Sequence, residues 1–233
     1  MVGAQERLTM AQLYYQLERK DDSLRSVRLG ISEAEAKGIL PKESFWALGT
    51  ALYNEKNQMD KVIDYLEKLV THYPKWKYWK QLGGMFGAQE RMTDQLVAYE
   101  VIYLNGELTK ESDVLAMAYM YLGAEVPYRA AKIIEKGIKD EIVEKNFKHY
   151  DLLGKSWFLA QHIPQALSSY ETASKYSDNG EIQYLIGSTY LDLGQDMMAY
   201  KASLKAEKKG GIKKPNANYA TMGNALLNMH CYK

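Results

Sequence analysis

The segment from Tyr150 to Ala173 constrains the fold more than any other part of the sequence. Its first half places a Leu-Gly pair, ending at Gly154, midway between two aromatic residues, and its second half places Ala166 four positions before Tyr170. Residues three and four positions apart lie on one face of an α-helix, so each half predicts a helix with one apolar face. Gly154 and Ala166 are small enough for the two helices to approach closely. The segment therefore predicts a pair of packed helices.

The same spacing recurs along the whole chain. We call the small residue at the Gly154 position the register residue of its repeat. Register residues follow one another at intervals of 33 to 38 positions, at Ala11, Gly49, Gly83, Ala116, Gly154, Gly187 and Gly223. A period of this length with two helices per repeat is typical of solenoids, in which each repeat buries its apolar face by stacking on its neighbours. The sequence therefore predicts an all-α array.

This motif resembles the tetratricopeptide repeat (TPR), a unit of about 34 residues with two helices. The resemblance implies an all-α, right-handed superhelix of about six helix pairs plus one terminal helix, with the first helix of each pair on the concave side. We expect one array over residues 1–233, with units at about 4–41, 42–75, 76–108, 109–146, 147–179 and 180–215 and a half unit at 216–233. Because the last unit has only its first helix, we expect the chain to be part of a longer protein.

Composition and charge narrow the possible functions. The chain has 46% hydrophobic and 25% charged residues, as folded soluble domains do. Its 30 basic and 29 acidic residues give a net charge of +1, so it lacks the basic character of a nucleic-acid-binding protein. No apolar run approaches the ~18 to 20 residues that span a bilayer. Residues 1–10 lack the apolar core of a secretory signal. Cys231 is the only cysteine, which excludes an internal disulfide and a cysteine-ligated metal site.

Motifs of catalysis and cofactor binding do not occur at the required spacing. Gly154-Lys155-Ser156 resembles the end of a phosphate-binding loop, but position 149, where that loop needs glycine, is histidine. The four histidines do not have the spacing of metal ligands; they are His72, His149, His162 and His230. We therefore expect no enzymatic activity, no cofactor and no bound metal.

The resemblance also predicts which side chains would face a partner. In TPR units, the inner surface is formed by the positions one after the first aromatic residue, one after the register residue and four after it. The partner-binding residues predicted in this way are Tyr15, Trp46, Tyr53, Lys80, Met117, Met120, Lys155, Phe158, Tyr184 and Leu191. Aromatic and methionine side chains on a surface are typical of a groove that holds a helix or an extended peptide.

A structural interpretation of the same residues stays open. Trp46 and Tyr53 could fold onto the core, and Met117, Met120 and Phe158 could be packing residues. Lys80 and Lys155 could belong to a basic strip or simply to a solvated face. If the binding interpretation holds, alanine at Trp46, Tyr53 and Phe158 should weaken partner capture without unfolding the array.

Two loop sequences point beyond the general family. The segments GILPKES at 38–44 and GELTKES at 106–112 are near copies, and each leads into the first helix of a repeat. Together with VPYRAAKIIEKGI at 126–138 and KGGI at 209–212, they resemble TPR proteins of Gram-negative bacteria that are associated with TonB energy-transduction systems. The resemblance implies a periplasmic scaffold that works beside the inner-membrane proteins ExbB, ExbD and TonB. A cytoplasmic location is the alternative, because the chain shows no signal peptide.

The sequence thus leads to two functional hypotheses. The preferred one is a non-catalytic scaffold whose concave face holds a peptide or helix of a protein partner, in support of TonB-dependent transport. The alternative is a structural or assembly subunit that acts through its convex face, or that self-associates through the incomplete C-terminal repeat.

Overall fold

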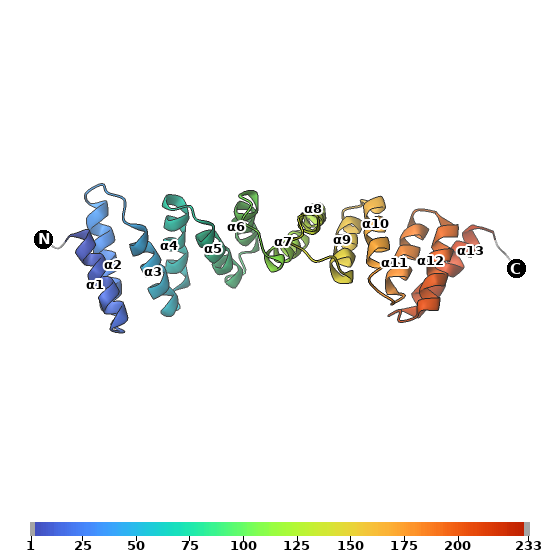
Figure 1. Cartoon of the computed structure of the whole chain (residues 1–233), viewed down its shortest axis with the longest axis horizontal. Coiled ribbons are helices and arrows are strands. Elements are labelled where there is room, and N and C mark those ends of the chain that lie inside the picture. Colours follow the sequence, from blue (N-terminus) through green and yellow to red (C-terminus); the bar gives the residue numbers. More distant parts are fainter. Residues whose placement is uncertain (1–2, 231–233) are drawn as a thin grey trace. The chain divides into compact units, whose positions relative to one another are not determined.

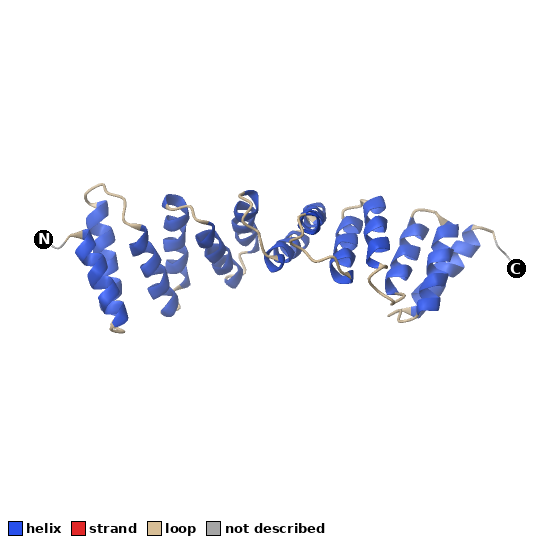
Figure 2. Cartoon of the chain, viewed as in Figure 1, coloured by secondary structure: helices blue, strands red, loops and turns tan. Residues whose placement is uncertain are grey.

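The computed structural model describes residues 3–230, which form thirteen α-helices and no β-strand (Figure 1, Figure 2). Cys231 and Tyr232 lie outside the described residues. The helices are α1 (Ala4–Gln16), α2 (Lys20–Glu35), α3 (Glu43–Glu55), α4 (Met59–His72), α5 (Trp76–Ala88), α6 (Met92–Leu104), α7 (Glu111–Gly123), α8 (Pro127–Lys139), α9 (Phe147–Leu159), α10 (Ile163–Ala173), α11 (Glu181–Asp192), α12 (Asp196–Lys209) and α13 (Pro215–Asn228). The predicted all-α fold of paired helices is confirmed.

The chain divides into two compact units. The N-terminal unit ends at Glu107 and contains α1 to α6; the C-terminal unit begins at Leu108 and contains α7 to α13. Within each unit an odd-numbered helix packs against the even-numbered helix that follows it, and each pair packs against the next pair. The core of the N-terminal unit includes Phe45, Leu52, Leu66 and Leu69, which are fully enclosed. That residues 1–233 form one continuous array stays a prediction.

The register glycines let the second helix of a pair lie directly on the first. A Cβ atom added to Gly49 would lie 2.2 Å from the ring of Tyr65 on α4, and one added to Gly154 would lie 2.4 Å from the ring of Tyr170 on α10. Real Cβ contacts are essentially never this short, so with any larger residue at these positions either the ring or the helix would have to move. The aromatic residue that follows Ala166 in the motif is therefore the one that covers the glycine.

The register residue of α7 differs from the sequence prediction. The prediction placed it at Ala116, with Tyr119 as the following aromatic residue. In the structure Tyr119 is 60% exposed, whereas Met117 and Ala118 are fully buried and Tyr121 is only 4% exposed. Ala118 therefore occupies the register position, two residues later than predicted.

The turns within the helix pairs support this correction. Each turn contains a residue in the left-handed region, with φ between 55° and 67°: Glu18, Asn57, Glu90, Glu125, Gln161 and Gly194. In the first, third, fifth and sixth pairs this residue lies seven positions after the register residue. Glu125 lies seven positions after Ala118 but nine after Ala116. Asn57 lies eight positions after Gly49, so the turn of the second pair is one residue longer.

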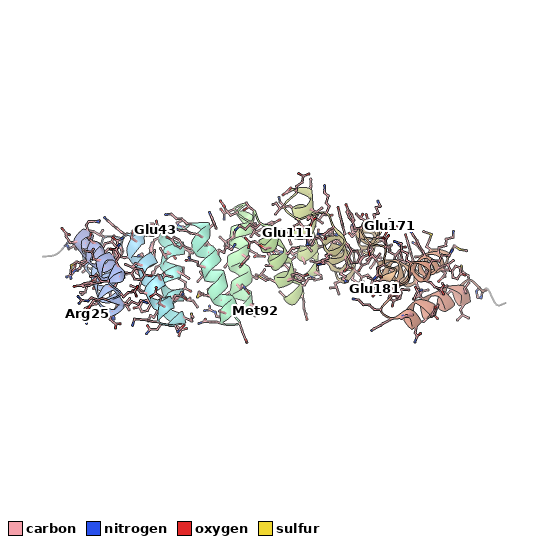
Figure 3. All side chains as sticks on the ribbon, turned by 60° about the horizontal axis from the view of Figure 1, so that its bottom comes forward. Arg25, Glu43, Met92, Glu111, Glu171 and Glu181 are labelled. Atoms are coloured by element: carbon pink, nitrogen blue, oxygen red, sulfur yellow. The ribbon has the colours of Figure 1, made fainter. Side chains whose placement is uncertain are left out.

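A glutamate at the start of a first helix connects successive pairs at three places. These residues are labelled in Figure 3 as Glu43, Glu111 and Glu181. Glu43, the first residue of α3, accepts hydrogen bonds from the Lys75 ammonium at 2.5 Å and from the Tyr78 hydroxyl. Glu111, the first residue of α7, accepts from the backbone N–H of Glu144 at 2.7 Å. Glu181, the first residue of α11, accepts from the backbone N–H of Lys213 at 2.8 Å. The two near-identical loop segments of the sequence thus place Glu43 and Glu111 at equivalent positions between neighbouring repeats.

The contact at Glu43 should make stability depend on acidic pH. The Lys75 ammonium, followed by the Tyr78 hydroxyl, holds the pKa of the Glu43 carboxyl below its ordinary value of 4.5. A carboxyl whose pKa is lowered by folding stabilises the fold above its unfolded pKa, and the contribution is lost as the pH falls through the folded pKa. We expect Glu43→Gln to be less stable than the wild type near neutral pH, and the difference to be smaller at about pH 3, where the carboxyl of the unfolded chain is protonated. Urea unfolding of both proteins at the two pH values measures this.

The control for this experiment is Glu67→Gln. Glu67 is an exposed glutamate of α4 whose carboxylate contacts no other described side chain in a hydrogen bond or ion pair. This variant should match the wild type at both pH values. A difference for Glu43→Gln that stays the same at both would show that the carboxylate charge contributes nothing.

Candidate functional site

Trp46 and Tyr53, two predicted partner-binding residues, are core residues in the structure. Trp46 is 5% exposed and Tyr53 is 7% exposed. Both rings meet Tyr65 of α4 edge to face, with centroid distances of 5.1 Å for Trp46 and 5.0 Å for Tyr53. Burial, with a smaller contribution from Tyr53, raises the pKa of the Tyr65 hydroxyl. These contacts favour the packing interpretation for both residues.

The reason lies in their position on α3. Trp46 is three residues before Gly49 and Tyr53 is four residues after it, so both share the face of the register glycine. That face is the one that α4 covers most closely. Their side chains therefore pack between the two helices of the pair and do not reach the surface lined by the first helices.

The other predicted residues of the N-terminal unit are half-buried. The Tyr15 hydroxyl donates a hydrogen bond to Glu55 at 2.7 Å, and this bond raises the pKa of the Tyr15 hydroxyl. Because Glu55 also pairs with Lys20 at 2.9 Å, Tyr15 belongs to a polar contact between the first and second helix pairs. Lys80 is half-buried on α5.

In the C-terminal unit the predicted residues differ widely in exposure. Met117 is fully buried, because it directly precedes the register residue Ala118, and this burial favours the packing interpretation for Met117. Lys155 is exposed and forms an ion pair with Asp151 at 2.5 Å, one helical turn earlier. The remaining predicted residues are half-buried; they are Met120, Phe158, Tyr184 and Leu191. Their role in partner binding stays a prediction.

A groove lies between α3 and α5, two first helices of the N-terminal unit. It has a volume of about 550 Å³, and we call it the α3–α5 groove. One wall is a face of α3, the other is a face of α5, and the floor is formed by apolar side chains of α4. Its lining consists of Ala47, Thr50, Ala51, Asn54, Val62, Leu66, Leu69, Lys77, Tyr78, Gln81, Gly84 and Met85.

Small side chains open the walls of this groove. Ala47, Thr50, Ala51 and Asn54 are spaced at i, i+3, i+4 and i+7, so they form one continuous face of α3. The Thr50 hydroxyl donates to the Trp46 carbonyl oxygen at 2.9 Å and therefore turns back toward its own helix. The result is a slot of about 550 Å³, a volume that suits a few side chains of an extended segment.

Polar groups stand at the rim of the groove. Asn54 and Gln81 are exposed, and their amide groups make no hydrogen bond with other described residues. Side-chain amides have both donors and acceptors, so they can pair with the backbone of an extended peptide. At one end of the groove the Lys77 ammonium lies 3.9 Å from the Glu43 carboxylate, which partly compensates its charge.

Only Thr50 and Gly84 of the groove were among the inner positions expected from the sequence. Ala47 and Asn54 each lie one residue after a predicted position, and one residue turns a helical side chain by about 100°. The i, i+3, i+4, i+7 spacing of small and polar residues from Ala47 to Asn54 was a signal that could have identified this face. The separation of α3 from α5, which opens the slot, had no signal in the sequence.

No group of three or more His, Cys, Asp and Glu side chains that could hold a metal ion occurs within residues 3–230. In the same range no helix combines the length and the apolar character needed to cross a bilayer.

Comparisons with known proteins show a likeness of fold. No protein-family model matches the sequence, and no curated protein gives a significant match. Three solved structures are similar to this chain over most of its length. A MamA protein is 18% identical, with a TM-score of 0.53 and a match that covers 66% of this chain and 82% of that one. YrrB, described as a TPR protein with an unusual peptide-binding site, is 12% identical, with a TM-score of 0.51 and coverage of 88% of this chain and 96% of that one. The structure of Naa15/Naa10 bound to HypK-THB is 10% identical, with a TM-score of 0.69 and coverage of 98% of this chain and 34% of that one. The fold is therefore that of a TPR solenoid.

Proposed function

We propose that this chain is a protein-binding scaffold whose α3–α5 groove receives an extended segment of a partner. The observation that carries the proposal is the slot of about 550 Å³ with small walls and an apolar floor. YrrB, which has the same fold, is described as having a peptide-binding site, and this adds support at the level of fold. No catalytic step is needed for this function.

The expected binding mode follows from the lining. An apolar side chain of the partner would pack against Ala47, Ala51 and Met85 in the groove walls, and burial of that side chain would supply most of the affinity. The amides of Asn54 and Gln81 would hold the partner's backbone at the rim. The length of the slot along α3 allows an extended segment of a few residues.

A bulky side chain at Ala51 should block the groove. Ala51 is exposed on the α3 wall, so Ala51→Trp adds volume to the slot without entering the core. We expect peptides selected against the wild-type chain from a display library to bind Ala51→Trp at least about tenfold more weakly, a loss of ~1.4 kcal/mol. Fluorescence polarisation with the selected peptides measures the dissociation constants.

The matched control is Ala36→Trp, at the exposed C-cap of α2 and outside the groove. It should bind the selected peptides as the wild type does. Both variants should unfold within about 0.5 kcal/mol of the wild type, because both changes are on the surface. Equal binding by the wild type and Ala51→Trp would show that the peptides use another face.

The loop segments at 38–44 and 106–112 support a narrower proposal about the cellular location of the protein and its partners. By their resemblance to TonB-associated TPR proteins, the scaffold would work in the periplasm of a Gram-negative cell, beside ExbB, ExbD and TonB. Fractionation of cells that express the tagged protein, followed by identification of copurified envelope proteins, tests both the location and the partners. Recovery in the cytoplasmic fraction, without any of these three proteins, would rule this placement out.

Self-association through α13 is the competing role. On α13, Tyr219 is 52% exposed and Leu227 is 55% exposed, and nothing lies within 4 Å of a Cβ built on Gly223, although register glycines elsewhere are covered by a second helix. A second copy that covers this face would make the chain a dimer. Light scattering at increasing protein concentration distinguishes this role from that of a monomeric scaffold with an intact groove.

A further inference from the structure

A second cavity of the N-terminal unit has a different chemistry from the α3–α5 groove. It lies between the start of α5 and the end of α6 and has a volume of about 600 Å³. Its walls include Trp76 and Trp79 from α5, Val101 from α6, and Asn105 and Glu107 from the segment after α6. We call it the Trp76–Trp79 pocket. Of its lining, only Lys77 also contributes to the α3–α5 groove.

The tryptophans form the aromatic side of the pocket. Trp76 is 50% exposed, an unusually open position for this residue type. Trp79 packs one part of its ring against the core of the unit and leaves another part at the pocket. Tryptophan faces carry the negative potential that attracts cations, more strongly than those of any other side chain.

Hydrogen-bond acceptors form the other side. The Asn105 amide nitrogen donates to the Val101 carbonyl oxygen at 2.8 Å, which leaves its Oδ1 atom as an acceptor. The Glu107 carboxylate forms no hydrogen bond or ion pair with any residue that the structure describes. The last turn of α6 contains no basic residue, so the partial negative charge of this helix end is not compensated there.

The two lysines beside the pocket direct their charges elsewhere. The Lys75 ammonium pairs with Glu43 at 2.5 Å, and the Lys77 ammonium lies 3.9 Å from the same carboxylate. Both ammonium groups therefore lie toward α3, although both lysines line the pocket. The open polar groups of the pocket are acceptors.

We propose that the Trp76–Trp79 pocket binds an arginine side chain of a protein partner. A guanidinium group is planar and carries five donors, so it can stack on a tryptophan face while it donates to Glu107 and to Asn105 Oδ1. A lysine ammonium could pair with the carboxylate but could not stack in this way. The site is separate from the α3–α5 groove. The partner would therefore carry an arginine in addition to the extended segment that enters the groove.

The probe for this site is the peptide acetyl-Gly-Arg-Gly-amide, titrated into the ¹⁵N-labelled full chain. The chain has four tryptophans, and two of them, Trp46 and Trp157, are buried at 5% and 3% exposure. We expect saturable shifts of the indole N–H signals of Trp76 and Trp79, with those of Trp46 and Trp157 unchanged. The same peptide with citrulline, a neutral isostere of arginine, should bind at least about tenfold more weakly, because charge-assisted hydrogen bonds are the stronger ones.

Variants of the chain locate the interaction. Glu107→Gln should weaken binding of the arginine peptide by about tenfold, and Glu67→Gln, an exposed glutamate outside the pocket, should not change it. Ala51→Trp, which blocks the α3–α5 groove, should also leave it unchanged, so failure of this site and failure of the groove can be told apart. Equal binding of the citrulline peptide, equal binding to Glu107→Gln, or loss of binding in Ala51→Trp would each overturn the proposal.

Discussion

Replacing Trp46 with alanine should lower the free energy of unfolding of the N-terminal unit by about 3 to 5 kcal/mol, the range for removal of a buried aromatic side chain. Trp46 is 5% exposed and meets Tyr65 edge to face at 5.1 Å, so alanine would leave a cavity at the contact between α3 and α4. Urea unfolding followed by circular dichroism measures the change. Hydrogen exchange of α3 and α4 amides shows whether it is confined to these helices, as nearest-neighbour stacking in repeat proteins predicts.

Two matched variants make this prediction specific. Trp76→Ala removes a tryptophan of the same unit that is 50% exposed, and it should change stability by no more than about 0.5 kcal/mol. Trp46→Phe keeps an aromatic ring against Tyr65 and removes an indole N–H that has no hydrogen-bond partner among the described residues, so it should cost much less than alanine. A Trp46→Ala protein with wild-type stability and weakened partner binding would return Trp46 to the binding surface.

Trp46 shows how far the repeat motif could predict this molecule. The spacing of small and aromatic residues identified the helices and their pairing, because a helix face with period 3.6 must be covered and Gly49 must lie under a ring. The same spacing places Trp46 on the covered face. The motif identifies the side chains that pack between the two helices of a pair. The fold could therefore be predicted from the sequence.

The α3–α5 groove was harder to predict, because it is a space that the side chains around it leave empty. Ala47 and Ala51 leave room only because α3 and α5 stand apart above α4, and that separation is set by packing throughout the pair of repeats. Trp46 is a core residue, whereas Ala47, the next residue in the chain, lines the groove. The pocket beside Trp79 is similar, since it joins α5 to residues that follow α6.

The register of α7 was ambiguous in the sequence for a different reason. Leu115-Ala116 followed by Tyr119 and Met117-Ala118 followed by Tyr121 both have the spacing of the motif. Both versions give a helix, but they bury opposite sets of side chains. Burial in the structure distinguishes them, since Tyr121 is enclosed and Tyr119 is exposed.

Alanine substitution in α7 should reproduce this difference as a difference in stability. Met117 is fully buried beside the register residue Ala118, so Met117→Ala should lower the free energy of unfolding of the C-terminal unit by about 2 to 5 kcal/mol. Tyr119 is 60% exposed on the same helix, so Tyr119→Ala should change it by no more than about 0.5 kcal/mol. The two residues are close in sequence, so helix propensity and position in the chain are nearly matched. Urea unfolding of both variants decides the register: the reverse order of costs would restore Ala116 as the small residue on which α8 packs, and similar costs would contradict both assignments.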